Sequence, residues 1–304
     1  MKKYLQLFFI FFFICTNVMV GVASEKPIEP EKQLKTFVSI LPQSYFVERI
    51  GGENVRAEVM VEPGTDPHTF EPTPKQMMKL WEADLYFGIG FPFEEQILKK
   101  LHGSNPKFVL VHTDKGVQRR TLDELPQQHK GKEELHHHHA DPALDPHIWL
   151  SPPEIKIQVT NIYEGLAQAD PDNAKMYKKN LENFLDEIEQ VHARFIKMFE
   201  PYRGRSFFAF HPAFGYFADV YGLLQMPIEI EGKIPTPKQI EALIGKAKEE
   251  NVNIIFVSPQ FNKKSAETIA DAIGGSVISI NPLEKNVLEN LEDMATKIEN
   301  SFKQ

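Results

Sequence analysis

Residues 170–204, DPDNAKMYKKNLENFLDEIEQVHARFIKMFEPYRG, carry the longest helical pattern of the chain. Apolar side chains recur there every three or four residues along one face: Tyr177, Leu181, Phe184, Ile188, Val191, Phe195 and Met198. Asp170 is suited to cap the start, Pro171 suits the first helical position, and Pro201 ends the pattern. We therefore expect one stiff helix over 171–200, roughly 45 Å long at 1.5 Å per residue.

On both sides of this helix, short apolar runs alternate with helical patterns. The runs typical of buried strands are Phe37–Leu41, Val55–Val61, Leu85–Gly88, Phe108–Val111, Phe207–Phe210, Leu224–Ile230, Ile254–Val257 and Val277–Ile280. The helical patterns are Pro74–Trp81, Phe93–Leu101, Pro237–Glu249, Lys263–Ile273 and Val287–Phe302. Strands alternating with helices indicate parallel βα units.

The predicted fold class is therefore α/β, with two (βα)4-type lobes that have parallel sheets and are joined by one long rigid backbone helix. We expect an N-terminal lobe over 25–170, the interlobe helix over 171–200 and a C-terminal lobe over 201–304. The alternative is one larger domain in which 171–200 is an ordinary core helix.

The start of the chain resembles an export signal. In residues 1–24, two lysines precede the apolar run Leu5–Cys15 and small residues follow, which predicts a secretory signal peptide. Bulky Phe13 and Ile14 precede Cys15, so a lipid anchor at Cys15 is not expected. Because Cys15 is the only cysteine, the exported chain can hold a metal only through nitrogen and oxygen ligands.

The overall composition is that of a globular protein. The 304 residues are 42% hydrophobic and 25% charged, which excludes a disordered chain. Their net charge of −8 excludes general attraction to nucleic acid or anionic lipid.

Histidines concentrate in one polar segment. Residues 115–144 lack apolar periodicity and form a predicted long loop, of a length that is usually functional or disordered. The loop contains His136, His137, His138 and His139. We interpret this run as an auxiliary metal-collecting site; an expression tag and a solvated loop without a role are the alternatives.

Three other histidines stand where parallel strands meet the following loops. His68 follows the strand Val55–Val61, His211 follows the strand that ends at Phe210, and His147 lies at the exit of the polar loop. Ligands of open parallel sheets bind at the carboxyl ends of the strands, so these side chains can face one cleft. A neighbouring proline restricts the backbone at each of the three.

Three imidazoles suit Zn²⁺, Cu²⁺, Ni²⁺ or Fe²⁺ better than Mg²⁺ or Ca²⁺. The alternative for each ring is a hydrogen-bonded turn or cap histidine. The repeated Asp-Pro-His, Asp66–His68 and Asp145–His147, can supply carboxylates that orient the rings, or can merely form turns, which we favour. If the rings bind metal, proton competition predicts weaker binding below pH roughly 6.5.

Six segments resemble one family. They are VEPGTDPHTFEPTP (61–74), ADLYFGIGFPFE (83–94), DPHIWLSP (145–152), FFAFHPAFGYFADVYGL (207–223), IFVSPQFNKKSAETIA (255–270) and VISINPL (277–283). Their order resembles that of the ZnuA- and TroA-like solute-binding proteins of ABC-type zinc and manganese importers. The resemblance implies two βα lobes joined by a backbone helix, one metal in the cleft and delivery to a membrane permease.

The resemblance also assigns ligands. It maps the metal ligands onto His68, His147 and His211, and a three-histidine site with a histidine-rich loop resembles the zinc branch. The fourth family position, usually acidic, aligns with Asn281. Asn281 could coordinate through its amide oxygen, or leave the place to water or to Glu284.

We therefore expect high-affinity capture of Zn²⁺ in the periplasm by a monomer that delivers it to an ABC transporter permease, with no enzymatic activity and no nucleic-acid partner. Two alternatives remain open. A manganese or iron solute-binding protein of the same family differs only in cargo. A secreted three-histidine zinc hydrolase would need a general base such as Glu71 or Asp66.

Overall fold

The computed structural model of the chain describes residues 33–102, 105, 108–122, 144–229, 235–261 and 263–303. The predicted signal peptide, 1–24, and His136, His137, His138 and His139 lie outside these residues and remain predictions. Among the helices in the described ranges, none combines the length and the apolar character needed to cross a membrane.

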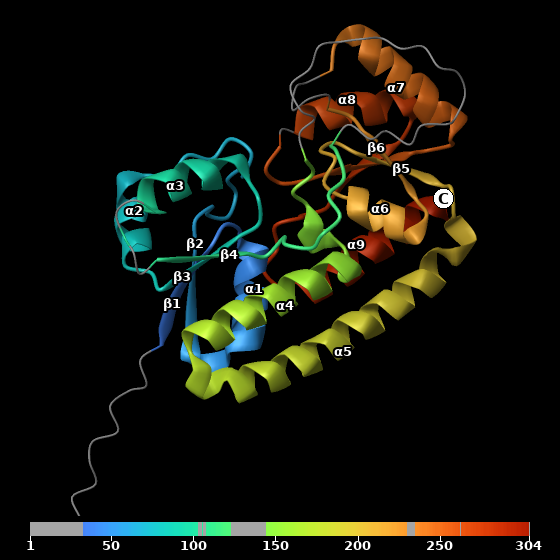
Figure 1. Cartoon of the computed structure of the whole chain (residues 1–304). Coiled ribbons are helices and arrows are strands. Elements are labelled where there is room, and N and C mark those ends of the chain that lie inside the picture. Colours follow the sequence, from blue (N-terminus) through green and yellow to red (C-terminus); the bar gives the residue numbers. More distant parts are fainter. Residues whose placement is uncertain are drawn as a thin grey trace, which may run out of the picture. The chain divides into compact units, whose positions relative to one another are not determined.

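Two four-stranded parallel sheets form the framework (Figure 1). The first has the order β2-β1-β3-β4, from β1 (Leu34–Val38), β2 (Val55–Val59), β3 (Leu85–Gly88) and β4 (Val109–His112). The second has the order β6-β5-β7-β8, from β5 (Ser206–Ala209), β6 (Leu224–Pro227), β7 (Ile254–Val257) and β8 (Ser276–Ser279). The predicted α/β class with two parallel sheets is confirmed. Strands β3, β5 and β7 are buried along their whole length, as strands covered on both faces should be.

The helices follow the strands in the order that βα units require. Those of the first half are α1 (Leu41–Gly51), α2 (Pro74–Trp81), α3 (Pro92–His102) and α4 (Pro152–Ala169). After α5 (Ala174–Phe199) come α6 (Gly215–Tyr221), α7 (Pro237–Glu249), α8 (Lys263–Ile273) and α9 (Val287–Phe302). The predicted strand Phe37–Leu41 was wrong at its end, because Leu41 already begins α1.

The sequence TPKQ begins a helix in each half. Thr73 and Thr236 are N-caps, and the side chain of the residue three positions later accepts a hydrogen bond from the cap backbone N–H, at 2.9 Å for Gln76 and 2.8 Å for Gln239. Proline follows each cap, where its missing N–H is not needed. These capping boxes explain why the predicted starts Pro74 and Pro237 are correct.

The predicted helix 171–200 is a continuous helical segment with a different start. A 3₁₀ turn (Pro171–Asn173) precedes α5, and another (Glu200–Tyr202) follows it. Asp170 does not cap the backbone of α5, as we had expected. Its carboxylate accepts hydrogen bonds from the side chains of Asn173 and Tyr177 instead, at 2.8 and 2.6 Å.

Helix α5 lies against elements of both halves. It contacts α1 and α4, which precede it in the sequence, and α6 and α9, which follow it. Further contacts join the halves: the Trp149 indole donates a hydrogen bond of 2.7 Å to the Pro282 carbonyl, and Lys285 pairs with Glu48 at 2.8 Å. The two sheets are thus held together by packing around their facing loops as well as by α5. The lobe boundaries 25–170 and 201–304 stay a prediction.

Candidate metal centre

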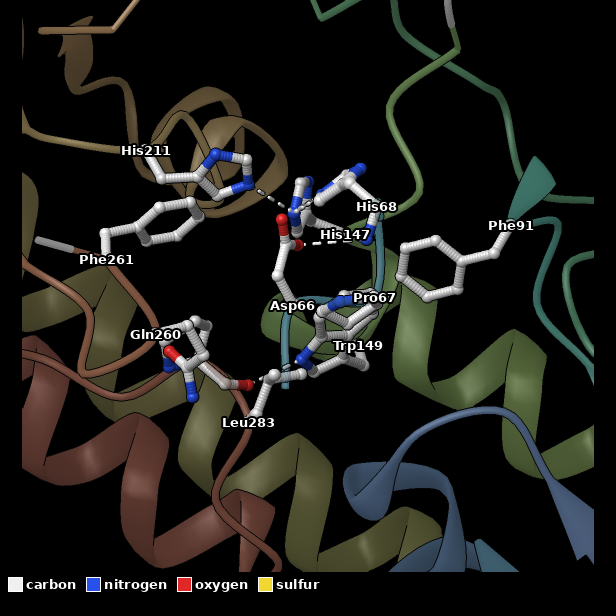
Figure 2. A pocket seen from close by; sticks show the side chains of 11 residues that line it. Asp66, Pro67, His68, Phe91, His147, Trp149, His211, Gln260, Phe261 and Leu283 are labelled. Carbon is white, nitrogen blue, oxygen red and sulfur yellow. Dashed lines mark hydrogen bonds between the residues drawn. The ribbon is translucent and has the colours of Figure 1, made fainter. Parts of the chain in front are cut away.

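Three imidazole rings from separate parts of the chain meet between the two sheets. One nitrogen from each of His68, His147 and His211 lies within 4.8 Å of the others. The Nε2 atom of His147 is 3.3 Å from Nε2 of His68 and 3.0 Å from Nε2 of His211. Figure 2 shows the three rings turned toward one another. The structure therefore brings together the three histidines that the sequence singled out.

Each ring is placed by the carboxyl end of a strand or by a short turn. His68 lies in the loop after β2, and His211 follows β5 by two residues. His147 directly precedes a 3₁₀ turn (Ile148–Leu150). The backbone N–H groups of His68 and His147 each donate to Oδ1 of the aspartate two residues earlier, both at 2.9 Å. These aspartate turns fix the backbone from which the two rings project.

Two buried carboxylates contact the outer nitrogens of the rings. Oδ1 of Asp145 lies 2.6 Å from Nδ1 of His147, and Oε1 of Glu229 is hydrogen-bonded to Nδ1 of His211. Asp145 is 0% exposed and Glu229 is 6% exposed. An ionised carboxylate only accepts hydrogen bonds, so each ring carries its proton on Nδ1 and presents the Nε2 lone pair inward.

Facing lone pairs need a positive partner. The two inward nitrogens of His147 and His211 lie 3.0 Å apart, and with both protons on Nδ1 there is no hydrogen between them. Nitrogens bound at about 2.0–2.1 Å around a tetrahedral zinc ion lie roughly 3.3 Å apart. The separations of 3.3 and 3.0 Å from His147 to His68 and His211 are close to this. The donor set and its spacing therefore fit a divalent ion of the zinc type.

Burial favours the neutral form of two of the rings, those of His68 and His147. Burial is the main reason that the pKa of His68 falls to about 2, with smaller contributions from the neighbouring imidazoles of His147 and His211. Burial also lowers the pKa of His147, although the Asp145 carboxylate opposes that shift. Metal binding requires neutral imidazole. From the ordinary histidine pKa we expected protons to compete with the metal below pH roughly 6.5. The lowered pKa of the buried rings moves the start of this competition to lower pH.

Aromatic side chains form the walls of the site (Figure 2). His68 contacts Phe91 edge-on with ring centroids 5.5 Å apart, and His211 stacks on Phe261 at 4.7 Å. The cavity bounded by the histidines and these rings has a volume of about 20 Å³. That is room for one ion or water molecule. Apolar walls exclude competing water and strengthen the electrostatic interactions inside.

Asn281 and Glu284 are engaged with other groups. The amide oxygen of Asn281 accepts hydrogen bonds from the Gln260 side chain, at 3.0 Å, and from the Leu283 backbone, at 3.1 Å. Its amide nitrogen donates to Glu284 at 2.6 Å. The residues that line the cavity include Gln260 and Leu283 but neither Asn281 nor Glu284. A role for either in coordination stays a prediction.

The structure separates the two aspartates that the sequence treated alike and adds a carboxylate that the sequence analysis missed. Asp66 accepts from the His68 backbone and from Thr69 Oγ1, so it forms only a turn, whereas Asp145 forms the turn and also holds its histidine ring. Glu229 comes two residues after β6. Its backbone N–H donates to the Phe210 carbonyl, which sets it beside His211. The available signal was an acidic residue within the apolar run Leu224–Ile230, which was predicted as a strand.

Comparisons with known proteins cover nearly the whole described chain. A family model described as ZnuA, zinc-uptake complex component A, periplasmic, matches residues 37–301. The high-affinity zinc uptake system protein ZnuA of Bacillus subtilis (strain 168) is 28% identical over 295 residues, covering 93% of this chain and 89% of that protein. The zinc-binding protein AdcA of Streptococcus pyogenes is 27% identical over 272 residues, covering 85% of this chain but 52% of AdcA.

Solved structures agree with the sequence matches. A crystal structure of ZnuA superposes with a TM-score of 0.80 at 39% identity, covering 89% of this chain and 99% of that one. A crystal structure of Zn(II)-bound AdcA from Streptococcus pneumoniae gives a TM-score of 0.73 at 21% identity, covering 90% of this chain and 58% of that one. The second likeness concerns the fold alone.

Proposed function

The chain belongs to the ZnuA family of zinc-uptake components, and from that premise we propose that it captures Zn²⁺ with high affinity and delivers it to an ABC-type zinc uptake permease. His68, His147 and His211 are the proposed ligands. The family is one of solute-binding transport proteins, so the bound metal is cargo.

The orientation of two rings carries the proposal. Asp145 and Glu229 each accept a hydrogen bond from the outer Nδ1–H of a histidine, so the lone pairs of the two inner nitrogens, 3.0 Å apart, face each other and favour a cation between them. Such carboxylate-histidine pairs orient ligand rings and raise their basicity. A histidine pair that only stabilised the fold would gain nothing from two lone pairs that face each other.

The ligand set favours zinc over manganese as the cargo. Neutral imidazole suits zinc, whereas manganese prefers carboxylate, carbonyl and water oxygens. Each carboxylate that touches the rings bonds an outer nitrogen. Competition of Zn²⁺ against Mn²⁺ and against Fe²⁺, under matched conditions, separates the proposal from a manganese or iron binding protein.

A zinc hydrolase is less well supported. A cavity of about 20 Å³ has no room for a peptide or ester beside the ion. Of the two candidate general bases, Asp66 holds the turn before His68, and Glu71 lines a separate outer groove.

Several finer features complete the proposal. The predicted signal peptide over 1–24 would place the protein in the periplasm without a lipid anchor at Cys15, acting as a monomer. Water, Asn281 or Glu284 would fill the fourth position. The loop histidines 136–139 would collect zinc for the main site.

Metal analysis of the purified protein tests the proposal. Protein prepared without added metal and dialysed to remove weakly bound ions should contain one tightly bound zinc per chain by elemental analysis, and His211→Ala should lose it. His112→Ala is the matched control, because the His112 side chain is 61% exposed on the surface. Wild-type protein without zinc, or full occupancy in His211→Ala, would refute the proposed function.

A further inference from the structure

Two arginines at the base of the polar loop converge on the residue that orients His147. Arg119 and Arg120 follow β4, and the Asp145 backbone N–H donates to the Arg120 carbonyl at 2.9 Å. Thr121 and Leu144 form an isolated antiparallel bridge beside them. Both ends of the loop are therefore tied to Asp145.

Arg119 fixes the backbone around this aspartate. Its guanidinium donates to the Asp145 carbonyl at 2.9 Å and to Asp114 at 2.8 Å, and it also bonds the Ile89 carbonyl. Gly90 lies beside it with φ of +97°, and a Cβ atom there would come within 2.5 Å of Arg119 Nη2. Arg119 thus joins the β3–α3 loop to the Asp145 main chain.

Arg120 contacts the carboxylate of Asp145. Its Nη1 is 3.7 Å from Asp145 Oδ2, and its Nε is 3.3 Å from Oδ2 of Asp219 in α6. The Arg120 side chain is 12% exposed. The Tyr216 hydroxyl, also on α6, accepts from the Arg120 backbone N–H at 3.2 Å and donates to the Asp145 carbonyl at 3.1 Å. Arg120 therefore links the His147 side of the site to a helix of the second half.

Gly215 makes this arrangement possible. A Cβ atom at Gly215 would lie 1.1 Å from Arg120 Nη1. The φ angle of Gly215 is not positive, so its own backbone accepts alanine. Because Gly215 has no side chain, the Arg120 guanidinium can occupy the space at the start of α6.

We propose that Arg120 is a positioning residue for the metal centre: seated over Gly215 between Asp145 and Asp219, it holds the Asp145 carboxylate against His147 and so slows the release of zinc. This inference rests on the proposed function. One oxygen of Asp145 serves the His147 ring and the other faces Arg120. Asp145 Oδ2 is buried and accepts no hydrogen bond from the described residues, so the guanidinium 3.7 Å away acts on it through charge alone. This ion-pair attraction offsets the burial of the carboxylate and favours the orientation in which the other oxygen faces the ring.

The ion pairs of Arg120 with Asp145 and Asp219 also connect the metal site to the second half of the chain. Arg120 reaches α6 in the second half, and α6 begins four residues after His211. Any displacement of α6 therefore acts on Arg120 and, through Asp145, on His147. Arg120 also directly precedes Thr121, whose bridge with Leu144 closes the polar loop, so a change in the loop acts on the same carboxylate.

Zinc dissociation rates test the proposal on the full exported chain. The zinc-loaded protein is mixed with excess chelator, and release is followed for wild type, Arg120→Gln, Gly215→Ala and the double variant. We expect about 5-fold faster release in each single variant, less than the 10–100-fold typical when a direct partner of a ligand is removed. The double variant should release no faster than Arg120→Gln, because the alanine then meets no guanidinium.

Three controls separate positioning from general destabilisation. Arg194→Gln removes another arginine ion pair, with Glu292, far from Asp145 in the chain, and should leave release unchanged. Arg120→Lys restores the charge and should recover part of the slow release. The visible absorption of the Co²⁺-loaded protein reports ligand geometry and should shift in Arg120→Gln but not in Arg194→Gln.

The outcomes distinguish this inference from the proposed function. Wild-type protein that binds no zinc overturns the proposed function. Wild-type protein that binds zinc, with unchanged release and Co²⁺ spectrum in Arg120→Gln, overturns the positioning role alone. Independent, additive effects of Arg120→Gln and Gly215→Ala would also contradict it.

Discussion

The two Asp-Pro-His segments, 66–68 and 145–147, are identical in sequence and differ in what their aspartates do. Both aspartates accept the backbone N–H of their histidine at 2.9 Å. Only Asp145, which is fully buried, also bonds the ring nitrogen of its histidine. Asp66 is partly exposed and takes Thr69 as its second partner. The tripeptide forms the turn in both places. Only at Asp145, which is buried and lies beside Arg119 and Arg120, does the aspartate also contact the histidine ring.

The largest expected effect comes from removing the ring contact. Asp145→Asn should raise the zinc dissociation constant by about 10–100-fold, because the amide no longer fixes the Nδ1 proton of His147. A competition titration against a chelator of known affinity measures this. An affinity equal to wild type would show that the two segments do not differ in function.

In the second half of the chain, Glu229→Gln is the counterpart of Asp145→Asn, because Glu229 contacts the His211 ring. Glu229→Gln should weaken zinc by about 10-fold, since Glu229 contacts His211 as Asp145 contacts His147. The same titration checks it. If Glu229→Gln alone has no effect, ring orientation by carboxylates matters only on the His147 side.

Acidification should destabilise the metal-free protein. The pKa of His68 is lowered to about 2 in the folded state, so between pH 6.5 and 2 the unfolded chain binds a proton that the folded chain does not. Stability is thus lost as the pH falls below about 6.5, by about 1.4 kcal/mol per pH unit for each such group.

Urea unfolding of EDTA-treated protein at pH 7.5 and 5.5 measures this loss. His68→Asn removes one titrating ring and should lose less stability than wild type over the same interval. His147 also has a lowered pKa and should keep contributing in that variant. Equal losses in both proteins would contradict the buried, neutral state of His68.

The smallest effect is expected at Asp66, the partly exposed aspartate. Asp66→Asn should change zinc affinity less than about 3-fold, because asparagine also forms such turns. The chelator titration used for Asp145→Asn provides the direct comparison. An effect of Asp66→Asn as large as that of Asp145→Asn would mean that Asp66 reaches the metal.

Much of the fold could be predicted because its signals are local. The Thr-Pro caps defined the starts of α2 and α7, and the apolar run Ile254–Val257 matches β7. Helices α1 and α6 were missed for local reasons too. Pro42 and Gly51 obscure the first, and the seven residues of the second are too few for a helical period.

The clustering of the three histidines of the candidate site was predictable, whereas of their supporting residues only Asp145 was named as a candidate, together with Asp66. Strand ends and neighbouring prolines singled out His68, His147 and His211. The roles of Glu229 and Arg120 depend on which strands and helices become neighbours, and Asp145 differs from Asp66 only through burial. Nearby residues can mark an acidic residue at a strand, such as Glu229, but they do not show which ring or carboxylate it and Arg120 contact.

Anomalous diffraction at the zinc absorption edge, from crystals of the zinc-loaded protein, tests the central claim most directly. The account predicts a strong peak at about 2.0–2.1 Å from Nε2 of His68, His147 and His211. A peak that lacks any one of these three nitrogens as a neighbour, or zinc bound only elsewhere on the chain, would contradict it.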